Sequence, residues 1–270
     1  MEQVKKTIFK DNIYKTKANS RIIWDKLWGN TRTYFVLKYI QMVIRNRKLA
    51  IKGIYNRKAW VLSSFEVFKL IEKCGGNFSI EGLEHIKNLN EPVVFVSNHM
   101  SAMESMIFPC LIAPYRKVTF VVKEALTTHF LFGPVMRARK PITVGRSNSR
   151  EDLMSVIKQG KELLTEGTSV IIFPQGSRKE IFKTSDFNSL GVKLAKSAKV
   201  KIVPIALKTD FWGNGKLVKD LGAIHRNKKI YISIDSPIEI SGNGKEANDR
   251  AIKFISDKLD YWNKTTELIH

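Results

Sequence analysis

The fold is decided at residues 93–104, where the sequence reads VVFVSNHMSAME. The four apolar residues Val93–Val96 predict a strand, and a continuous apolar run is typical of a strand that is covered on both faces. The polar residues Ser97–His99 predict a turn, and the segment from Ala102 to Leu111 has the pattern of a helix. A buried strand, a turn and a helix in succession form the repeating unit of layered α/β proteins.

The same alternation continues outward along the chain. Six more apolar, β-rich runs predict strands, at Phe78–Ile80, Val118–Val122, Ile142–Val144, Ser169–Phe173, Ile202–Leu207 and Ile230–Ile234. Helical patterns lie between or after them, at Arg150–Glu166, Phe187–Ala198 and Glu246–Trp262. We therefore expect an α/β fold with a mixed or mostly parallel sheet flanked by helices.

The N-terminal part of the chain has a different texture. Residues 1–32 are basic and lack a clean period, and two apolar helical stretches follow at Tyr34–Ile44 and Trp60–Ile71. The pattern changes near residue 75. We predict an N-terminal basic, helical, membrane-associating segment at residues 1–75 and an α/β domain at residues 76–270.

The chain of 270 residues is strongly basic. It has 46 Lys and Arg against 25 Asp and Glu, a formal net charge of +21. Residues 1–60 contain fifteen of these cations and three of the acids, a net of +12. Such an excess predicts an anionic partner: a membrane surface, a nucleic acid, or an acidic protein or substrate.

The position of the cations favours the membrane surface. They follow the most apolar helix, so its apolar face can enter the acyl boundary while Lys and Arg meet lipid phosphates. The alternative is a helical hairpin that packs on the core with a solvated basic edge. No apolar run is long enough to span a bilayer, no signal peptide is evident, and two cysteines are too few for a disulfide framework. We expect a peripheral or interfacial protein on the cytoplasmic face of the membrane.

His99 and Glu104 are the first candidates for chemistry. His99 follows a buried strand, at the sheet edge where α/β folds bind ligands. A strand-to-helix turn can fold Glu104 onto it, so that the carboxylate holds one imidazole nitrogen and leaves the other free to take a proton. The chain has no G-x-S-x-G motif, so that proton would come from a substrate hydroxyl and not from an enzyme nucleophile. The alternative is that both residues are helix-capping or surface residues.

Two more turns predict anion binding. Residues 173–179 read FPQGSRK, in which Pro174 and Gly176 favour a tight turn with exposed N–H groups, and Ser177 and Arg178 add a hydroxyl and a cation. Arg146 lies at the end of another predicted strand. Each turn alone fits an ordinary basic surface loop. Together with His99, they could converge at one sheet edge as a site for acyl or phosphoryl chemistry.

In this order, the residues resemble the conserved blocks of the glycerolipid acyltransferase family, whose best-known members are the 1-acylglycerol-3-phosphate acyltransferases. Asn98-His99 through Glu104 resembles N-H-x-x-x-x-D, with Glu for Asp. Residues 142–146, ITVGR, resemble a second block that usually has an acid where this chain has Gly145. Residues 173–178, FPQGSR, resemble F-P-E-G-T-R, and Val203-Pro204 resembles a short hydrophobic block. The resemblance spans about residues 77–235.

The resemblance implies an acyltransferase. His99 would be the general base and Glu104 its orienting acid. Substrate binding would fall to Arg146, Gln175, Gly176, Ser177 and Arg178. The expected reaction moves a fatty acyl group from a thioester donor, acyl-CoA or acyl carrier protein, to a hydroxyl of a lysophospholipid, most simply 1-acylglycerol-3-phosphate. No cofactor or metal is expected.

Several alternatives stay open at this point. Glutamate in place of aspartate also occurs in the acyltransferases that finish lipid A, so the acceptor could be lipid A-like or an amino-acid lipid. A catalytically silent lipid-binding relative is a further alternative. A nucleic-acid-binding protein is disfavoured, because the anion-binding turns coincide with the acyltransferase blocks. The apolar residues of 100–108 either line an acyl slot or belong to the core.

Overall fold

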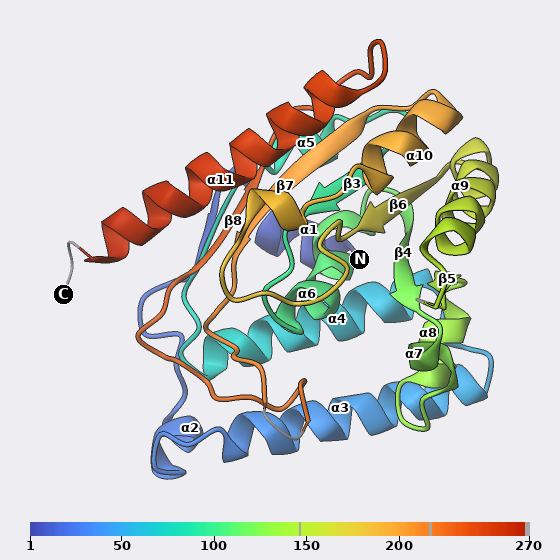
Figure 1. The fold of residues 1–270 in the computed structure, drawn as a ribbon. Coiled ribbons are helices and arrows are strands. Elements are labelled where there is room, and N and C mark those ends of the chain that lie inside the picture. Colours follow the sequence, from blue (N-terminus) through green and yellow to red (C-terminus); the bar gives the residue numbers. More distant parts are fainter. Residues whose placement is uncertain (146, 216–217, 268–270) are drawn as a thin grey trace.

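The computed structural model describes residues 1–145, 147–215 and 218–267, which form one sheet with helices on both faces (Figure 1). The strands are Tyr14–Lys15 (β1), Phe78–Glu81 (β2), Val94–Ser97 (β3), Lys117–Lys123 (β4), Ile142–Val144 (β5), Thr168–Ile172 (β6), Ile202–Lys208 (β7) and Ile230–Ile234 (β8). Their order in the sheet is β1-β2-β8-β7-β3-β6-β4-β5.

The sheet is mixed. Strands β7, β3, β6, β4 and β5 are parallel neighbours, whereas β8 is antiparallel to β7, β2 is parallel to β8, and β1 is antiparallel to β2. The predicted α/β class with a mixed sheet is confirmed. The carboxyl ends of the five parallel strands lie at one edge, where an α/β sheet binds its ligands.

The helices account for most of the remaining chain. They are Glu2–Ile8 (α1), Ile23–Leu27 (α2), Thr33–Ile51 (α3), Arg57–Lys73 (α4), Glu84–Lys87 (α5), Met103–Ile112 (α6), Ala125–Thr128 (α7), Gly133–Ala138 (α8), Ser149–Thr165 (α9), Leu190–Ala198 (α10) and Lys245–Glu267 (α11), with a 3-10 turn at Thr184–Asp186. Among the described residues, no helix combines the length and the apolar character needed to cross a bilayer.

The central strands bury both of their faces. In β3, Val94 and Val96 pack into the cluster formed with α9, α10 and α11, and Phe95 packs on the other side with α4 and α6. Side chains of a strand point alternately to the two faces, so a strand covered on both sides must be apolar at every position. This explains the uninterrupted run at residues 93–96.

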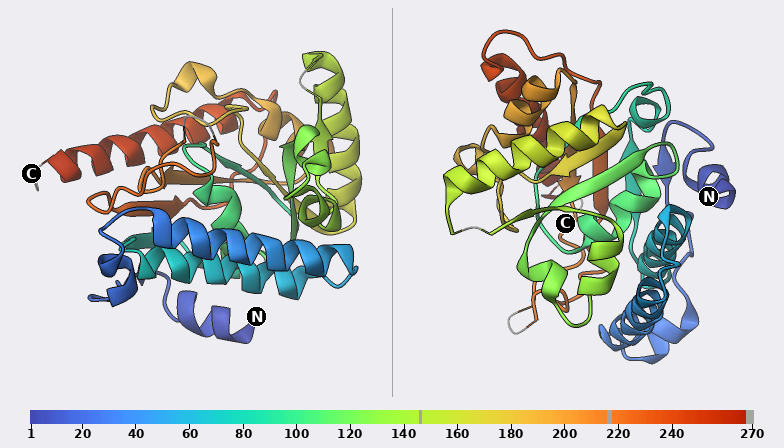
Figure 2. Two further views of the ribbon diagram at one scale, coloured as in Figure 1. Left: turned by 90° about the horizontal axis from the view of Figure 1, so that it is seen from below. Right: turned by 90° about the vertical axis from the view of Figure 1, so that its right-hand side faces the viewer.

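The N-terminal segment packs onto the same core. α3 and α4 lie side by side below the sheet (Figure 2), and buried residues of both, such as Tyr39 and Phe68, join the cluster that contains Phe95. β1 adds a strand to the sheet edge beside β2. The prediction of a boundary at residue 75 stays a prediction.

Candidate active site

The turn that presents His99 is fixed by the two residues before it. The buried side chain of Asn98 donates to the carbonyl of Leu207 (2.8 Å) and accepts from the Leu207 N–H (2.8 Å). The Ser97 hydroxyl donates to the carbonyl of Ile205 (2.8 Å). These bonds hold the end of β3 against β7, so the backbone position of His99 is set by the neighbouring strand.

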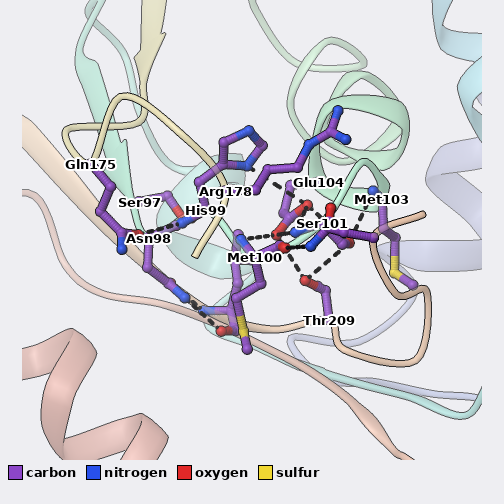
Figure 3. A network of polar contacts seen from close by, with 12 residues as sticks. Ser97, Asn98, His99, Met100, Ser101, Met103, Glu104, Gln175, Arg178 and Thr209 are labelled. Atoms are coloured by element: carbon purple, nitrogen blue, oxygen red, sulfur yellow. Dashed lines mark hydrogen bonds and ion pairs between the residues drawn. The ribbon is translucent and has the colours of Figure 1, made fainter. Parts of the chain in front are cut away.

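Glu104 lies fully buried in the first turn of α6, under the same turn (Figure 3). Its carboxylate accepts hydrogen bonds from the N–H groups of Met100 (2.7 Å) and Ser101 (2.8 Å) and from the hydroxyl of Thr209 (2.8 Å). The Ser101 hydroxyl donates to it as well (3.1 Å). Burial raises the pKa of Glu104, although the hydrogen bonds from Ser101, Thr209 and Met100 oppose this effect.

These contacts also make Glu104 part of a helix cap. The Ser101 hydroxyl accepts from the N–H of Met103 (3.1 Å), while Glu104 accepts from the Ser101 N–H (2.8 Å), so both side chains satisfy N–H groups at the start of α6. This structural role is the alternative considered for Glu104. It does not exclude the predicted contact with His99. Oε1 of Glu104 accepts from Met100 and Thr209, and Oε2 is the oxygen that faces Nδ1 of His99.

The structure brings His99 and Glu104 together. The imidazole Nδ1 lies 3.8 Å from Oε2 of Glu104, within ion-pair range but beyond the length of a hydrogen bond. The ring of His99 stacks on Phe173, with ring centroids 4.1 Å apart. The catalytic roles of both residues stay predictions.

The turn after β6 is bonded to the backbone of His99 on both sides. Gln175 Oε1 accepts from the His99 N–H (2.7 Å), and the N–H of Lys179 donates to the His99 carbonyl (2.8 Å). Gly176 has φ +68°, a left-handed conformation that suits glycine. Gln175 was predicted to bind substrate; here its oxygen holds the histidine turn, a contact that its sequence position did not reveal.

Arg178 has a partner that sequence reasoning missed. Its Nη2 lies 2.6 Å from Oδ1 of Asp220, which comes from the long connection between β7 and β8. Asp220 is in turn held through its carbonyl, which accepts from the indole N–H of Trp212 (3.2 Å). No spacing rule links residues 178 and 220, because only the path of that connection brings them together.

The second predicted anion-binding position, Arg146, lies outside the described residues. Its neighbour Gly145 stands where the related block usually has an acid, and the structure shows a carboxylate close by. Oδ1 of Asp152, from α9, accepts from the Gly145 N–H (2.8 Å). Among the described residues, no three His, Cys, Asp or Glu side chains gather in a way that could hold a metal ion.

A cavity of about 630 Å³ lies at the carboxyl ends of β4, β5 and β6, and His99, Gly176, Ser177 and Arg178 line it together with apolar residues such as Leu126. This size is typical of small-ligand sites. The apolar residues Met103, Ile107 and Phe108 of α6 do not face this cavity. They are buried in the core. Met106 of the same helix is only partly buried and lines a second cavity together with Arg178, so the acyl slot stays a prediction.

The comparisons with known proteins agree with this geometry. Residues 77–208 match the family model described as Acyltransferase. The 1-acyl-sn-glycerol-3-phosphate acyltransferase of Pseudomonas aeruginosa is 30% identical over 190 residues, which cover 68% of this chain and 70% of that protein. The chain belongs to the glycerolipid acyltransferase family. The predicted family and the predicted enzyme class, an O-acyltransferase, are confirmed.

Two further relatives extend this result. The chloroplastic 1-acyl-sn-glycerol-3-phosphate acyltransferase LPAT1 of Arabidopsis thaliana is 29% identical over 183 residues, 67% of this acyltransferase but only 49% of its relative. The crystal structure of the 1-acyl-sn-glycerophosphate acyltransferase PlsC from Thermotoga maritima has a TM-score of 0.63 at 18% identity. It covers 85% of this chain and 92% of that chain, and shows that the two share a fold.

Proposed function

We propose that this acyltransferase moves a fatty acyl group from a thioester donor, acyl-CoA or acyl carrier protein, to the free hydroxyl of 1-acylglycerol-3-phosphate. The main observation behind this proposal is the position of the His99 imidazole. It lies 3.8 Å from the buried carboxylate of Glu104, on the wall of a cavity that Arg178 also lines. The acceptor is proposed from the names of the relatives, which are 1-acylglycerol-3-phosphate acyltransferases in both bacteria and plants.

The proposed reaction needs no covalent acyl-enzyme. The acceptor oxygen attacks the thioester carbon while Nε2 of His99 takes the hydroxyl proton, so a C–O bond forms. The C–S bond then breaks, and the imidazolium returns the proton to the leaving thiolate. Glu104 keeps Nδ1 protonated and stabilises the imidazolium. Binding both substrates in one cavity lowers the barrier further by orientation.

The acceptor phosphate would lie against the turn after β6. The N–H groups around Gly176, the hydroxyl of Ser177 and the guanidinium of Arg178 are the proposed donors, and Arg146 is a proposed second cation. Because Arg178 already pairs with Asp220, the phosphate would share this guanidinium with a carboxylate. No cofactor or metal is part of the proposed mechanism.

The proposed place of the reaction is an anionic membrane surface on the cytoplasmic side. α3 packs on α4 and also leaves Leu37, Ile44 and Ile51 exposed. These residues are seven positions apart, two turns of helix, so they form one apolar stripe. Cations on the same helix, such as Lys38 and Lys48, suit lipid phosphates.

The reaction is tested with purified enzyme, 1-acylglycerol-3-phosphate and each thioester donor, with the diacyl product measured by mass spectrometry. His99→Ala should lower kcat/KM by about 10³-fold, within the range of a lost general base. His85→Ala, which removes a half-exposed imidazole paired with Glu84, is the control. If His99→Ala retained a tenth of the activity, the assignment of the base would fail.

The acceptor site is tested separately. Arg178→Ala should raise KM for 1-acylglycerol-3-phosphate about tenfold with a smaller change in kcat. Monoacylglycerol, which lacks the phosphate, should be a poor acceptor for the wild-type enzyme and equally poor for the variant. An unchanged KM would remove Arg178 from the phosphate site. Lipid A-type and amino-acid lipid acceptors belong in the same panel, since faster acylation of either would replace the proposed acceptor.

A further inference from the structure

The short helix α2 is inverted in polarity. Its apolar side chains face outward, with Ile23 60%, Trp24 60% and Leu27 66% exposed, and Trp28, directly after it, 45% exposed. Its acidic residue Asp25 is instead fully buried. An ordinary surface helix does the reverse, because exposed apolar area costs free energy in water. Four large apolar side chains within six residues form a patch of the kind that marks an interaction site.

The patch is held in place from beneath. The Asp25 carboxylate accepts from Arg21 (2.6 Å) and, through both oxygens, from Arg226 (2.7 and 3.1 Å). Arg226 also donates to the carbonyls of Asn30 (2.6 Å) and Thr31 (2.8 Å), just after the helix. The exposure of α2 therefore does not come from a loosely attached segment. The fold uses a buried ion cluster to keep this apolar surface outside.

The distribution of tryptophan singles out the same place. The chain has five tryptophans, and all five lie in the described residues. Trp60, Trp212 and Trp262 are buried, so the two exposed ones are Trp24 and Trp28. Tryptophan is enriched at membrane–water interfaces, where the ring enters the apolar boundary and the indole N–H stays near the headgroups.

The charge near this patch and its position on the molecule indicate which partner would bind there. Lys17, Lys26 and Arg32 are exposed and lie close to the patch in the sequence, within the N-terminal stretch of net charge +12. α2 lies at the end of α3, at the lower left of the molecule in Figure 1. An apolar patch rimmed by cations complements an anionic bilayer, which offers acyl chains beneath phosphate groups.

We propose that α2 and Trp28 form an interfacial anchor, which inserts Ile23, Trp24, Leu27 and Trp28 into the headgroup–acyl boundary of an anionic phospholipid membrane. This inference deepens the proposed membrane association and rests on it. The Arg226 clamp belongs to the same β7–β8 connection that supplies Asp220 to Arg178, so the anchor and this ion pair are held by one segment.

The two exposed tryptophans make the wild-type protein its own probe. Vesicles of mixed phosphatidylglycerol and phosphatidylcholine should shift its tryptophan emission to the blue, and brominated acyl chains should quench it. Trp24→Phe/Trp28→Phe should bind vesicles while losing most of this shift, since the remaining tryptophans are buried. Vesicles of phosphatidylcholine alone should bind more weakly, because the cations lose their partners.

The contribution to affinity is measured by vesicle sedimentation. Trp24→Ser/Trp28→Ser should lower the vesicle partition coefficient by about tenfold or more, because the two indole rings that the wild-type protein inserts into the membrane are absent. Tyr261→Ser is the matched control. Tyr261 is a comparably exposed ring on α11, outside the proposed anchor, and its loss should leave partitioning unchanged. Circular dichroism confirms that both variants are folded.

The contrary outcomes are distinguishable. Wild-type protein that sediments with vesicles without any change in tryptophan emission would show that another surface docks, which overturns the α2 anchor and leaves membrane association standing. Protein that does not sediment with anionic vesicles at all would overturn membrane association itself. A blue shift that grows with protein concentration in the absence of lipid would show that a second copy covers α2, which also overturns the anchor.

Discussion

Two buried carboxylates lie in different parts of this acyltransferase, Glu104 beside His99 and Asp25 on α2. The hydrogen bonds to Glu104 come from backbone N–H groups and from the hydroxyls of Ser101 and Thr209, all of which are neutral. Asp25 is held instead by the guanidinium groups of Arg21 and Arg226. Both arrangements satisfy the oxygens, but only the second neutralises the charge.

The difference separates a carboxylate suited to chemistry from one suited to structure. Neutral donors hold Glu104 and add no positive charge, so in the proposed reaction its carboxylate can stabilise an imidazolium on His99 through a low-dielectric contact. An arginine bound to Glu104 would cancel that effect. Burial of this uncompensated charge is the reason that the pKa of Glu104 is raised. At Asp25 the carboxylate pairs with Arg21 and Arg226, and these ion pairs hold α2 in place.

The sharpest way to break this comparison is Glu104→Gln, which keeps the shape and removes the charge. kcat should fall about a hundredfold or more, because the imidazolium loses its stabilising partner. The measurement is single-turnover acyl transfer with saturating acceptor. Glu166→Gln, a change at an exposed position just after α9, is the control. Unchanged kcat would mean that Glu104 acts only as the helix cap.

Asp25→Asn should have the opposite effects, a lower free energy of unfolding and a nearly unchanged kcat. We expect a loss of about 2 kcal/mol in the free energy of unfolding, less than the ~3–5 kcal/mol of a fully buried ion pair, because both arginines are partly exposed. kcat toward detergent-dispersed acceptor should stay within about twofold. Urea unfolding and the acyl-transfer assay measure the two effects. A fall in kcat with unchanged stability would reverse the assignment of roles.

Thr209→Val sharpens the comparison at Glu104, and kcat should fall about tenfold. The Thr209 hydrogen bond lowers the pKa of Glu104, so its loss raises that pKa further. Protonation then neutralises Glu104 at a higher pH, and the acid limb of the pH–rate profile should move to higher pH. Thr209→Ser keeps the hydroxyl and should restore the wild-type profile. A lower kcat with an unmoved profile would indicate a packing defect only.

The smallest effect is expected at the two thiols. Burial raises the pKa of both Cys74 and Cys110 to about 12, and Asp25 adds to the effect at Cys74. At pH 8 both should therefore stay protonated and react slowly with maleimide, since the thiolate is the nucleophile. Asp25→Asn should speed labelling of Cys74 severalfold and leave Cys110 unchanged, as peptide mass spectrometry would show. Equal rates at both would mean global unfolding.

The sequence predicted the order and position of most elements. The seven strands expected from apolar runs are all present, and β5 and β8 have the expected bounds. Runs such as residues 93–96 were readable because burial on both faces leaves a purely apolar signal. β1, α1, α2 and the short helices near residues 84, 125 and 133 were missed. They are too brief to show a period, and contacts far along the chain hold them in place.

The candidate site was predicted in part. His99 and Glu104 could be paired from sequence because they are five residues apart across one turn, so local geometry brings them close. Thr209 and Asp220 could not, because they reach Glu104 and Arg178 from the end of β7 and the segment beyond it. Asn98 was visible in the motif, but its bonds to Leu207 depend on which strand neighbours β3.

The amino-acid sequence by itself determined the α/β alternation, the basic N-terminal segment, the histidine–glutamate turn and the family, since each is written in residues close together along the chain. Only the tertiary structure decided which buried carboxylate is held by neutral donors and which is paired with arginines. The donors to Glu104 and Asp25 include Thr209 and Arg226, each more than a hundred residues away. Spacing along a chain sets local geometry, whereas the electrostatics of a buried group depend on whatever the fold packs around it.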